Sequence, residues 1–267
     1  SASHTSDIAL GYRAGFGVGS LASNYNIYAG YRTGESSDNN ADSILIGRRA
    51  GFDNKNINAT VAIGFSALRQ ATTDAGWSGS NSTAVGYAAG YDSHGDYLSV
   101  YGTYAGSYIG YGESLADKKS LEITAIGDYS LYLIGKGVKG VVAVGTAAGQ
   151  GVWGSRRPSG SFATNVGYYS GLGAQNASGV AIGEKAGYFS DSSGSVLVGA
   201  YAGSGSLGDH NIMLGYGAGA VVTGDNNIFI GEDVAKNGGT LNKHLKIGSG
   251  SLVTISGSLD TGDVIFA

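Results

Sequence analysis

A short hydrophobic pattern recurs along the whole chain. Each copy reads apolar, any residue, apolar, Gly, two variable residues, Ala and Gly, as in ILIGRRAG from Ile44 and VAIGEKAG from Val180. Fourteen copies occur, and their first glycines, from Gly11 to Gly248, are 16 to 25 residues apart, with 16 the commonest spacing. The apolar, any, apolar alternation indicates a short β-strand, and the frequent β-branched residues support it.

The short period predicts the architecture. A repeat of about 16 residues is too short for helical repeats, and it predicts an all-β parallel β-solenoid (β-roll or β-helix) of about 13–14 coils over residues 1–248. The first Gly of each copy permits a sharp corner, and the Ala–Gly pair that follows predicts a second short strand and a second corner. The structural glycines expected at the first corner include Gly47, Gly64, Gly86, Gly145, Gly183, Gly199 and Gly215.

The middle residue of each expected strand bears on assembly. It is apolar in all copies but two, which carry Asn165 and Lys246. If the flanking residues fill the coil, the middle residue points outward, and an apolar outward column indicates a sheet that is covered on both faces. We expect a homotrimer that packs this column around a three-fold axis; the alternative is a sheet covered by the chain's own loops.

Composition removes several classes of function. The chain of 267 residues has 49 Gly, no Cys and a formal net charge of −4. The lack of Cys excludes disulfides and thiolate metal sites, and the charge gives no reason to expect a nucleic-acid partner. No apolar run approaches the length of a membrane-spanning helix, so we expect no membrane insertion. Two G-x-G-x-x-G matches, at 135–140 and 203–208, lack the βαβ context of a dinucleotide site, and the four His share no column; no cofactor or metal is expected.

The repeats carry a family resemblance. VAIGEKAG, VAVGTAAG and TAVGYAAG resemble the head repeats of trimeric autotransporter adhesins and, still more, the IGxxAG repeats of bacteriophage tail fibres and tailspikes. The run from Leu245 to Ala267 resembles the segment that precedes a self-cleaving chaperone in many phage tail proteins, so residues 249–267 are expected to form a capping or trimerising segment. The resemblance implies a homotrimeric receptor-binding domain in a virion tail fibre, outside the cell, that attaches to a bacterial surface glycan or outer-membrane protein. The alternative is the head of a bacterial trimeric adhesin at the cell surface.

Extra residues in a few coils mark the expected binding face. Insertions at about 69–82, 107–123, 132–140 and 150–162 all follow the second corner, so they leave the solenoid on one side. They hold both tryptophans together with tyrosines and arginines, which are typical of binding hot spots. The candidate receptor-binding residues are Arg69, Trp77, Tyr108, Tyr111, Tyr132, Trp153, Arg156 and Arg157.

Each of these signals has a second interpretation. Trp77 and Trp153 could fold back and staple their own loops. The column after the corner Gly, with Tyr12, Tyr31 and Tyr87, is either an exposed glycan-contacting stripe or a ladder of stacked rings between coils. The carboxylates of the insertions leave room for a glycosidase pair, as in a polysaccharide-degrading tailspike. The interpretation favoured here is a binding protein without enzymatic activity.

Overall fold

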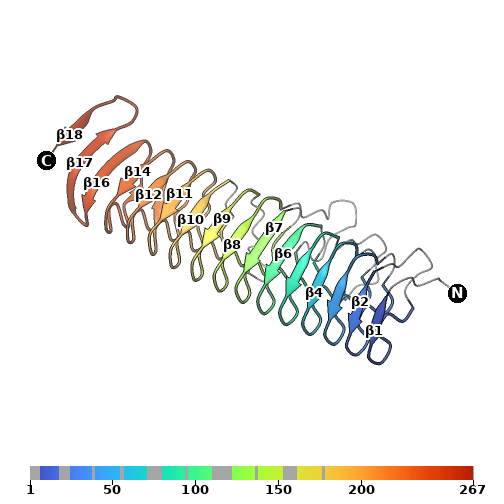
Figure 1. Cartoon of the computed structure of the whole chain (residues 1–267). Coiled ribbons are helices and arrows are strands. Elements are labelled where there is room, and N and C mark those ends of the chain that lie inside the picture. The colour runs from blue at the N-terminus through green and yellow to red at the C-terminus, as the bar shows by residue number, and fades with distance from the viewer. Residues whose placement is uncertain are drawn as a thin grey trace. The chain divides into compact units, whose positions relative to one another are not determined.

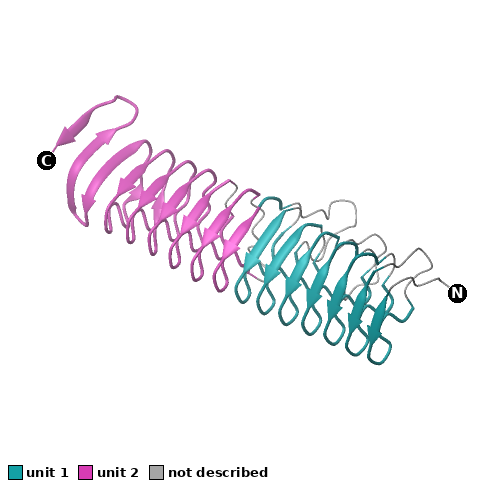
Figure 2. Cartoon of the chain, viewed as in Figure 1, with its two compact units in different colours: residues 1–140 teal, residues 141–267 magenta. Residues whose placement is uncertain are grey.

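The protein folds as strands joined by tight turns. The computed structural model describes residues 7–17, 25–37, 40–54, 57–70, 80–93, 96–109, 122–135, 138–152, 161–175 and 178–266, and no helix occurs in these ranges. The chain divides into two compact units, Ser1–Gly140 and Val141–Ala267, which are coloured separately in Figure 2.

Unit 1 is a stack of parallel strands. Neighbours in sequence are neighbours in the sheet, and the register joins the same position of consecutive repeats, as in Ile27 with Ile44 (Figure 1). Its strands are β1 (Ile8–Leu10), β2 (Ile27–Ala29), β3 (Ile44–Ile46), β4 (Val61–Ile63), β5 (Thr83–Val85), β6 (Leu98–Tyr101) and β7 (Ile123–Ile126).

Unit 2 continues the same repeat and ends differently. Its parallel strands are β8 (Val142–Val144), β9 (Thr164–Val166), β10 (Val180–Ile182), β11 (Val196–Val198), β12 (Ile212–Leu214), β14 (Ile228–Ile230) and β16 (His244–Ser249). Strands β13 (Val222–Thr223) and β15 (Gly239–Thr240) form a separate parallel pair. Each of the fourteen copies found in the sequence coincides with one strand of the main ladders, so the all-β parallel solenoid is confirmed.

The corner glycines are required by both conformation and space. The corner glycines named from the sequence have φ between 125° and 142°. A Cβ on Gly145 would lie 2.6 Å from the carbonyl oxygen of Gly167 in the next coil, closer than real Cβ contacts allow. The corners therefore stack backbone on backbone, which no other residue permits.

The Ala–Gly pair after the corner forms a turn instead of the predicted second strand. Ala50 and Gly51 lie in a turn in which Gly51 has a φ of 64°, in the left-handed region. Hydrogen bonds still join the coils here, since the Gly51 N–H donates to the Ala67 carbonyl at 2.9 Å. The prediction of a second strand was wrong because the repeated left-handed residues bend the chain too tightly for extended backbone.

The direction of the strand side chains is opposite to the one expected from the sequence. The middle residues Leu45 and Leu197 are 0% and 1% exposed, whereas the flanking Ile44 and Ile46 are 36% and 38% exposed. The coil interior is narrow: in unit 2 the middle residues pack with the turn alanines Ala186, Ala202 and Ala218 in one core cluster. There is room for one inward side chain per strand, and in a three-residue strand that is the central one.

This orientation leaves an apolar outer face on the sheet. The flanking positions are mostly Ile and Val, and they are partly or fully exposed in both units, as at Ile63 (36%) and Ile182 (39%). The apolar column that the sequence assigned to the outside is the core, and the outside carries larger β-branched side chains. The outer face is thus more apolar than the sequence argument assumed.

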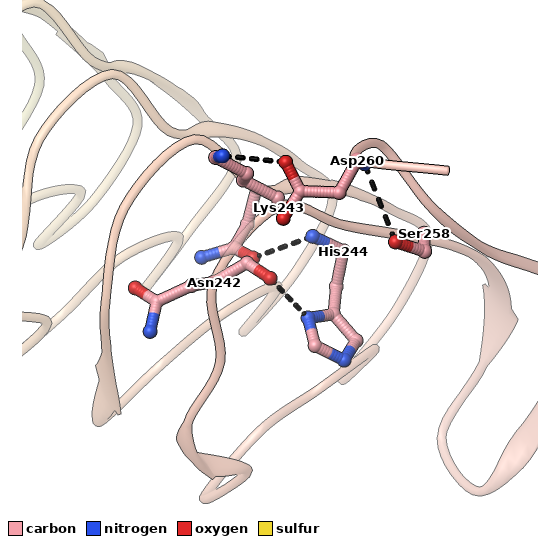
Figure 3. Close-up of polar contacts among 6 residues, drawn as sticks. Asn242, Lys243, His244, Ser258 and Asp260 are labelled. Atoms are coloured by element: carbon pink, nitrogen blue, oxygen red, sulfur yellow. Dashed lines mark hydrogen bonds and ion pairs between the residues drawn. The ribbon is translucent and has the colours of Figure 1, made fainter. Parts of the chain in front are cut away.

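The last strands of unit 2 leave the parallel repeat. Strand β17 (Leu252–Ser258) pairs antiparallel with β16, and β18 (Val264–Phe266) pairs antiparallel with β17. Figure 3 shows that Lys243, just before β16, pairs with Asp260 in the turn between β17 and β18. Within the last coil, the His244 Nδ1 lies 2.7 Å from the Asn242 carbonyl oxygen. The Asp260 N–H donates to the Ser258 hydroxyl at 3.3 Å.

Candidate functional site

Aromatic and arginine side chains line the turns that follow the strands of unit 1. They come from the first, second, fifth and sixth residues after the corner glycines, so each column repeats once per coil. We call them the aromatic–arginine strip. Its rings are Tyr12, Phe16, Tyr31, Phe52, Phe65, Tyr87, Tyr91, Tyr104, Tyr108, Tyr129 and Tyr132, and its cations are Arg13, Arg32, Arg48, Arg49 and Arg69.

The rings contact one another from coil to coil. The ring centroids of Phe65 and Tyr87 are 5.0 Å apart with planes 5° apart, and those of Tyr104 and Tyr129 are 5.4 Å apart at 23°. The stacking follows from the parallel register, which places equivalent residues about 4.8 Å apart. The ladder interpretation of the column directly after the corner Gly is therefore confirmed for Phe65 and Tyr87, although Tyr87 remains 47% exposed. Tyr104 and Tyr129 stack in the same way one position further along the turn.

Arginines occupy the gaps between the rings. The Arg48 guanidinium carbon lies 5.6 Å from the centroid of Tyr31 and 5.5 Å from that of Phe65. Arg69 lies in the same way between Phe52 and Tyr91, at 5.5 and 5.6 Å. These are cation–π distances, so the rings hold the guanidinium groups in place.

A buried acid neutralises the first two arginines of the strip. The Glu35 side chain, 2% exposed, pairs with Arg13 at 2.7 Å and with Arg32 at 2.5 Å. The hydrogen bond from Arg32 to Glu35 raises the pKa of the Arg32 guanidinium above its ordinary value. Glu35 is therefore a structural anion of the strip, because a buried carboxylate needs this pairing.

A cleft opens within the strip beside Arg69. It has a volume of about 170 Å³ and is lined by Phe65, Ser66, Arg69, Tyr87, Ala88, Tyr91, Tyr104 and Tyr108. The lining is aromatic with one cation and several hydroxyl groups. This combination offers apolar contact, hydrogen bonds and one charge-assisted bond to a small polar group.

Burial raises the pKa of three tyrosines of the strip. Burial, and then the nearby Tyr91, raise the pKa of Tyr108 to about 12. Burial also raises the pKa of Tyr104 and of Tyr132. Their hydroxyls remain neutral and are able both to donate and to accept hydrogen bonds.

The structure brings together three of the binding residues named from the sequence. Tyr108 lies 5.5 Å from Tyr132 and 5.4 Å from Tyr91 between ring centroids, and Tyr91 is the ring over which Arg69 is placed. The other five, Trp77, Tyr111, Trp153, Arg156 and Arg157, lie outside the described residues.

Sequence reasoning missed part of this site. Tyr91, Tyr104 and Arg49 were not candidates, because they lie outside both the insertions and the column directly after the corner Gly. A signal was present: the fifth residue after Gly47, Gly64 and Gly86 is Phe52, Arg69 and Tyr91. A large column at this offset identifies Tyr91, whereas Tyr104 and Arg49 stand at the second residue after Gly102 and Gly47.

The same columns in unit 2 carry a different chemistry. Lys185 lies over the Tyr201 ring at 5.2 Å and 3.9 Å from Glu184, and Lys236 pairs with Asp233 at 3.0 Å. Both lysines have a neighbouring acid, and among the residues that the structure describes the arginines lie in unit 1.

Metal ligands do not cluster in the described part of the chain. No group of three or more His, Asp or Glu side chains there could hold a metal ion. The described residues also include no helix long and apolar enough to cross a membrane.

Sequence comparisons identify no family for the chain. No protein-family model matches the sequence, and a search of curated proteins finds no significant match. The parallel β-solenoid and the aromatic–arginine strip are therefore the basis for assigning a function.

Proposed function

We propose that this chain is the receptor-binding domain of a phage tail fibre or tailspike, which attaches to a glycan or protein on the bacterial surface. The observation that supports the proposal is the aromatic–arginine strip, in which Arg69, Tyr108 and Tyr132 meet around Tyr91. Tyrosine and arginine on a rigid scaffold combine contact area with hydrogen bonding at little entropic cost, which is typical of binding hot spots.

The position of the strip also suits recognition. Its side chains project from turns, while the strands beneath them are fixed by a continuous ladder of backbone hydrogen bonds. Binding residues on turns that are held by a rigid scaffold are the usual arrangement in recognition proteins. Trp77, Tyr111, Trp153, Arg156 and Arg157 belong to the proposal as further contact residues of the insertions.

We propose in addition that the domain assembles as a homotrimer through the outer face of the sheet. The flanking columns, and not the middle column, would form the interface, because Ile44, Ile46 and Ile63 are partly exposed. An exposed face made mostly of Ile and Val is unfavourable in water, and a second copy of the same face would cover it.

The test of the receptor-binding function is a pull-down of labelled protein on a panel of bacterial cells and their purified surface polysaccharides. A reducing-end assay on the supernatant accompanies it. We expect binding without new reducing ends. New reducing ends would contradict the non-enzymatic proposal and favour a polysaccharide-degrading tailspike, whereas absence of binding to every cell type would overturn the receptor-binding function itself.

A further inference from the structure

The positive charge of the strip is only partly neutralised. Arg13 and Arg32 share Glu35, but Arg48, Arg49 and Arg69 form no ion pair with a carboxylate among the described residues. Asp53 acts electrostatically on Arg32, and Asp92 on Tyr108, so these two acids lie beside the strip. Asp128, directly after the corner Gly127, is a fourth acid in these columns and accepts a hydrogen bond from the Thr103 N–H. Five arginines against four acids still leave a net positive strip in a chain whose formal net charge is −4.

The unpaired arginines are held in place before any ligand arrives. Arg48 lies between Tyr31 and Phe65, and Arg69 between Phe52 and Tyr91. Side chains that are already ordered lose less entropy on binding. The planar guanidinium also presents its donors as a fork that fits a carboxylate or a phosphate.

Part of the donor capacity of these arginines is unused. The Nε atoms of Arg49 and Arg69 are buried and have no hydrogen-bond partner among the described residues. The acceptors Asn54 Oδ1 and Gln70 Oε1 in the turns of the same coils are also buried without a partner. Because buried polar atoms are normally satisfied, a water or a ligand group that bridges these atoms would complete their hydrogen bonds. The cleft beside Arg69 provides room for one, with Tyr87 and Tyr104 on its walls.

We infer that the strip binds an acidic polysaccharide, whose anionic groups contact Arg48, Arg49 and Arg69 and whose hydroxyls bond to the tyrosines of the adjacent cleft. This inference rests on the proposed receptor-binding function and names its ligand class. A polymer fits because equivalent positions repeat about every 4.8 Å along the coils. The anionic group is a uronic-acid carboxylate or a phosphodiester, since both match the guanidinium fork.

The geometry favours a saccharide over a nucleic acid. Single-stranded nucleic acids bind by stacking their bases on exposed ring faces. In the strip the faces of Phe65 and Tyr87 lie against each other, and those of Tyr12 and Tyr31 do so at 5.4 Å and 18°. The ring edges and hydroxyls remain for contact, and these suit a hydroxyl-rich polymer.

The test measures binding of the whole chain to four immobilised polymers: polygalacturonate, poly(glycerol phosphate), neutral dextran and oligothymidylate. We expect binding to polygalacturonate or poly(glycerol phosphate), whichever carries the matching anion, that weakens as salt is raised. The double variant Arg48→Gln/Arg69→Gln should bind at least tenfold more weakly. Lys185→Gln, which removes a cation from the same columns of unit 2, should bind as the wild type does. Arg69→Lys keeps the positive charge but lacks the planar guanidinium. Its affinity should lie between those of the wild type and the double variant.

The outcomes separate this inference from the function on which it rests. Binding to dextran as tight as binding to the acidic polymers would overturn the inference of an acidic ligand. An unchanged affinity of the double variant for the acidic polymers would do the same. Neither result would contradict attachment to bacterial cells. Tighter binding to oligothymidylate than to either acidic polymer would overturn it in favour of a nucleic acid. Attachment to bacteria without binding to any of the polymers would also refute it, whereas loss of all cell attachment would refute the receptor-binding function.

Discussion

The rings of Phe65 and Tyr87 lie face to face in adjacent coils, with centroids 5.0 Å apart and planes 5° apart. Tyr87 also meets Tyr104 edge to face at 5.5 Å, so one ring joins two neighbours. The strip therefore serves the stability of unit 1 as well as the proposed contact with a ligand.

Removing the Tyr87 ring should destabilise unit 1 moderately. Tyr87→Ala is expected to lower the free energy of unfolding by about 1–2 kcal/mol, because aromatic pairs contribute about 0.5–1.5 kcal/mol beyond their buried area. Denaturant unfolding followed by circular dichroism measures this. Tyr87→Phe keeps the ring and should cost much less; an equal loss in both variants would assign the effect to the hydroxyl.

The corner glycines should be far less replaceable than glycines elsewhere. Gly145→Ala would place a Cβ 2.6 Å from the Gly167 carbonyl oxygen at a residue with a φ of 130°. We expect it to lower the free energy of unfolding by about 3 kcal/mol or more. Gly250→Ala is the control, since Gly250 has a φ of 56° and no atom within 4 Å of the added Cβ. Gly250→Ala should lower the free energy of unfolding by about 1–2 kcal/mol. Similar thermal midpoints for the two variants would argue against backbone contact at the corner.

Adjacent residues of β3 test the direction of the side chains. Leu45 is fully buried, so Leu45→Ala should cost about 2–5 kcal/mol. Ile46 is 38% exposed, so Ile46→Ala should cost about 1 kcal/mol when measured at high dilution. The reverse order of the two losses would restore the orientation that the sequence suggested.

The proposed trimer depends on the flanking columns. Ile46→Lys together with Ile63→Lys places two charges on the outer face, and like charges brought together in an assembly are unfavourable. We expect sedimentation to show a change from trimer to monomer. Val221→Lys is the control, because Val221 is 58% exposed and lies outside the flanking columns. A wild-type chain that sediments as a monomer at high concentration would rule the trimer out.

Alkaline pH should weaken the fold. Tyr108 and Tyr28 both have a pKa raised to about 12, mainly by burial, against an ordinary value of 10.0. Between these values the folded chain holds protons that the unfolded chain releases, so stability is full below pH 10 and falls as pH rises toward 12. Unfolding measured from pH 8 to 12 should show a shallower fall for Tyr28→Phe than for the wild type. An identical slope in the variant would exclude Tyr28 as a source of the effect.

The sequence alone determined the repeat and its strands. The position of each copy, from Ile8 to Leu245, could be read directly because the corner glycines and the alternating apolar residues are local features. A backbone that needs positive φ at one place per coil selects Gly there, whatever the rest of the structure does.

Only the tertiary structure decided which side of each strand is the core. In a strand such as Ile44–Leu45–Ile46, the middle side chain points to the opposite face of the sheet from the two flanking side chains. Because all three residues are apolar, the pattern does not predict which face lies inside the coil. The width of the coil decides this, and that width depends on how closely the alanine turns approach the sheet. The strip likewise required the structure, because Arg69, Tyr91 and Tyr108 come together through the stacking of separate coils.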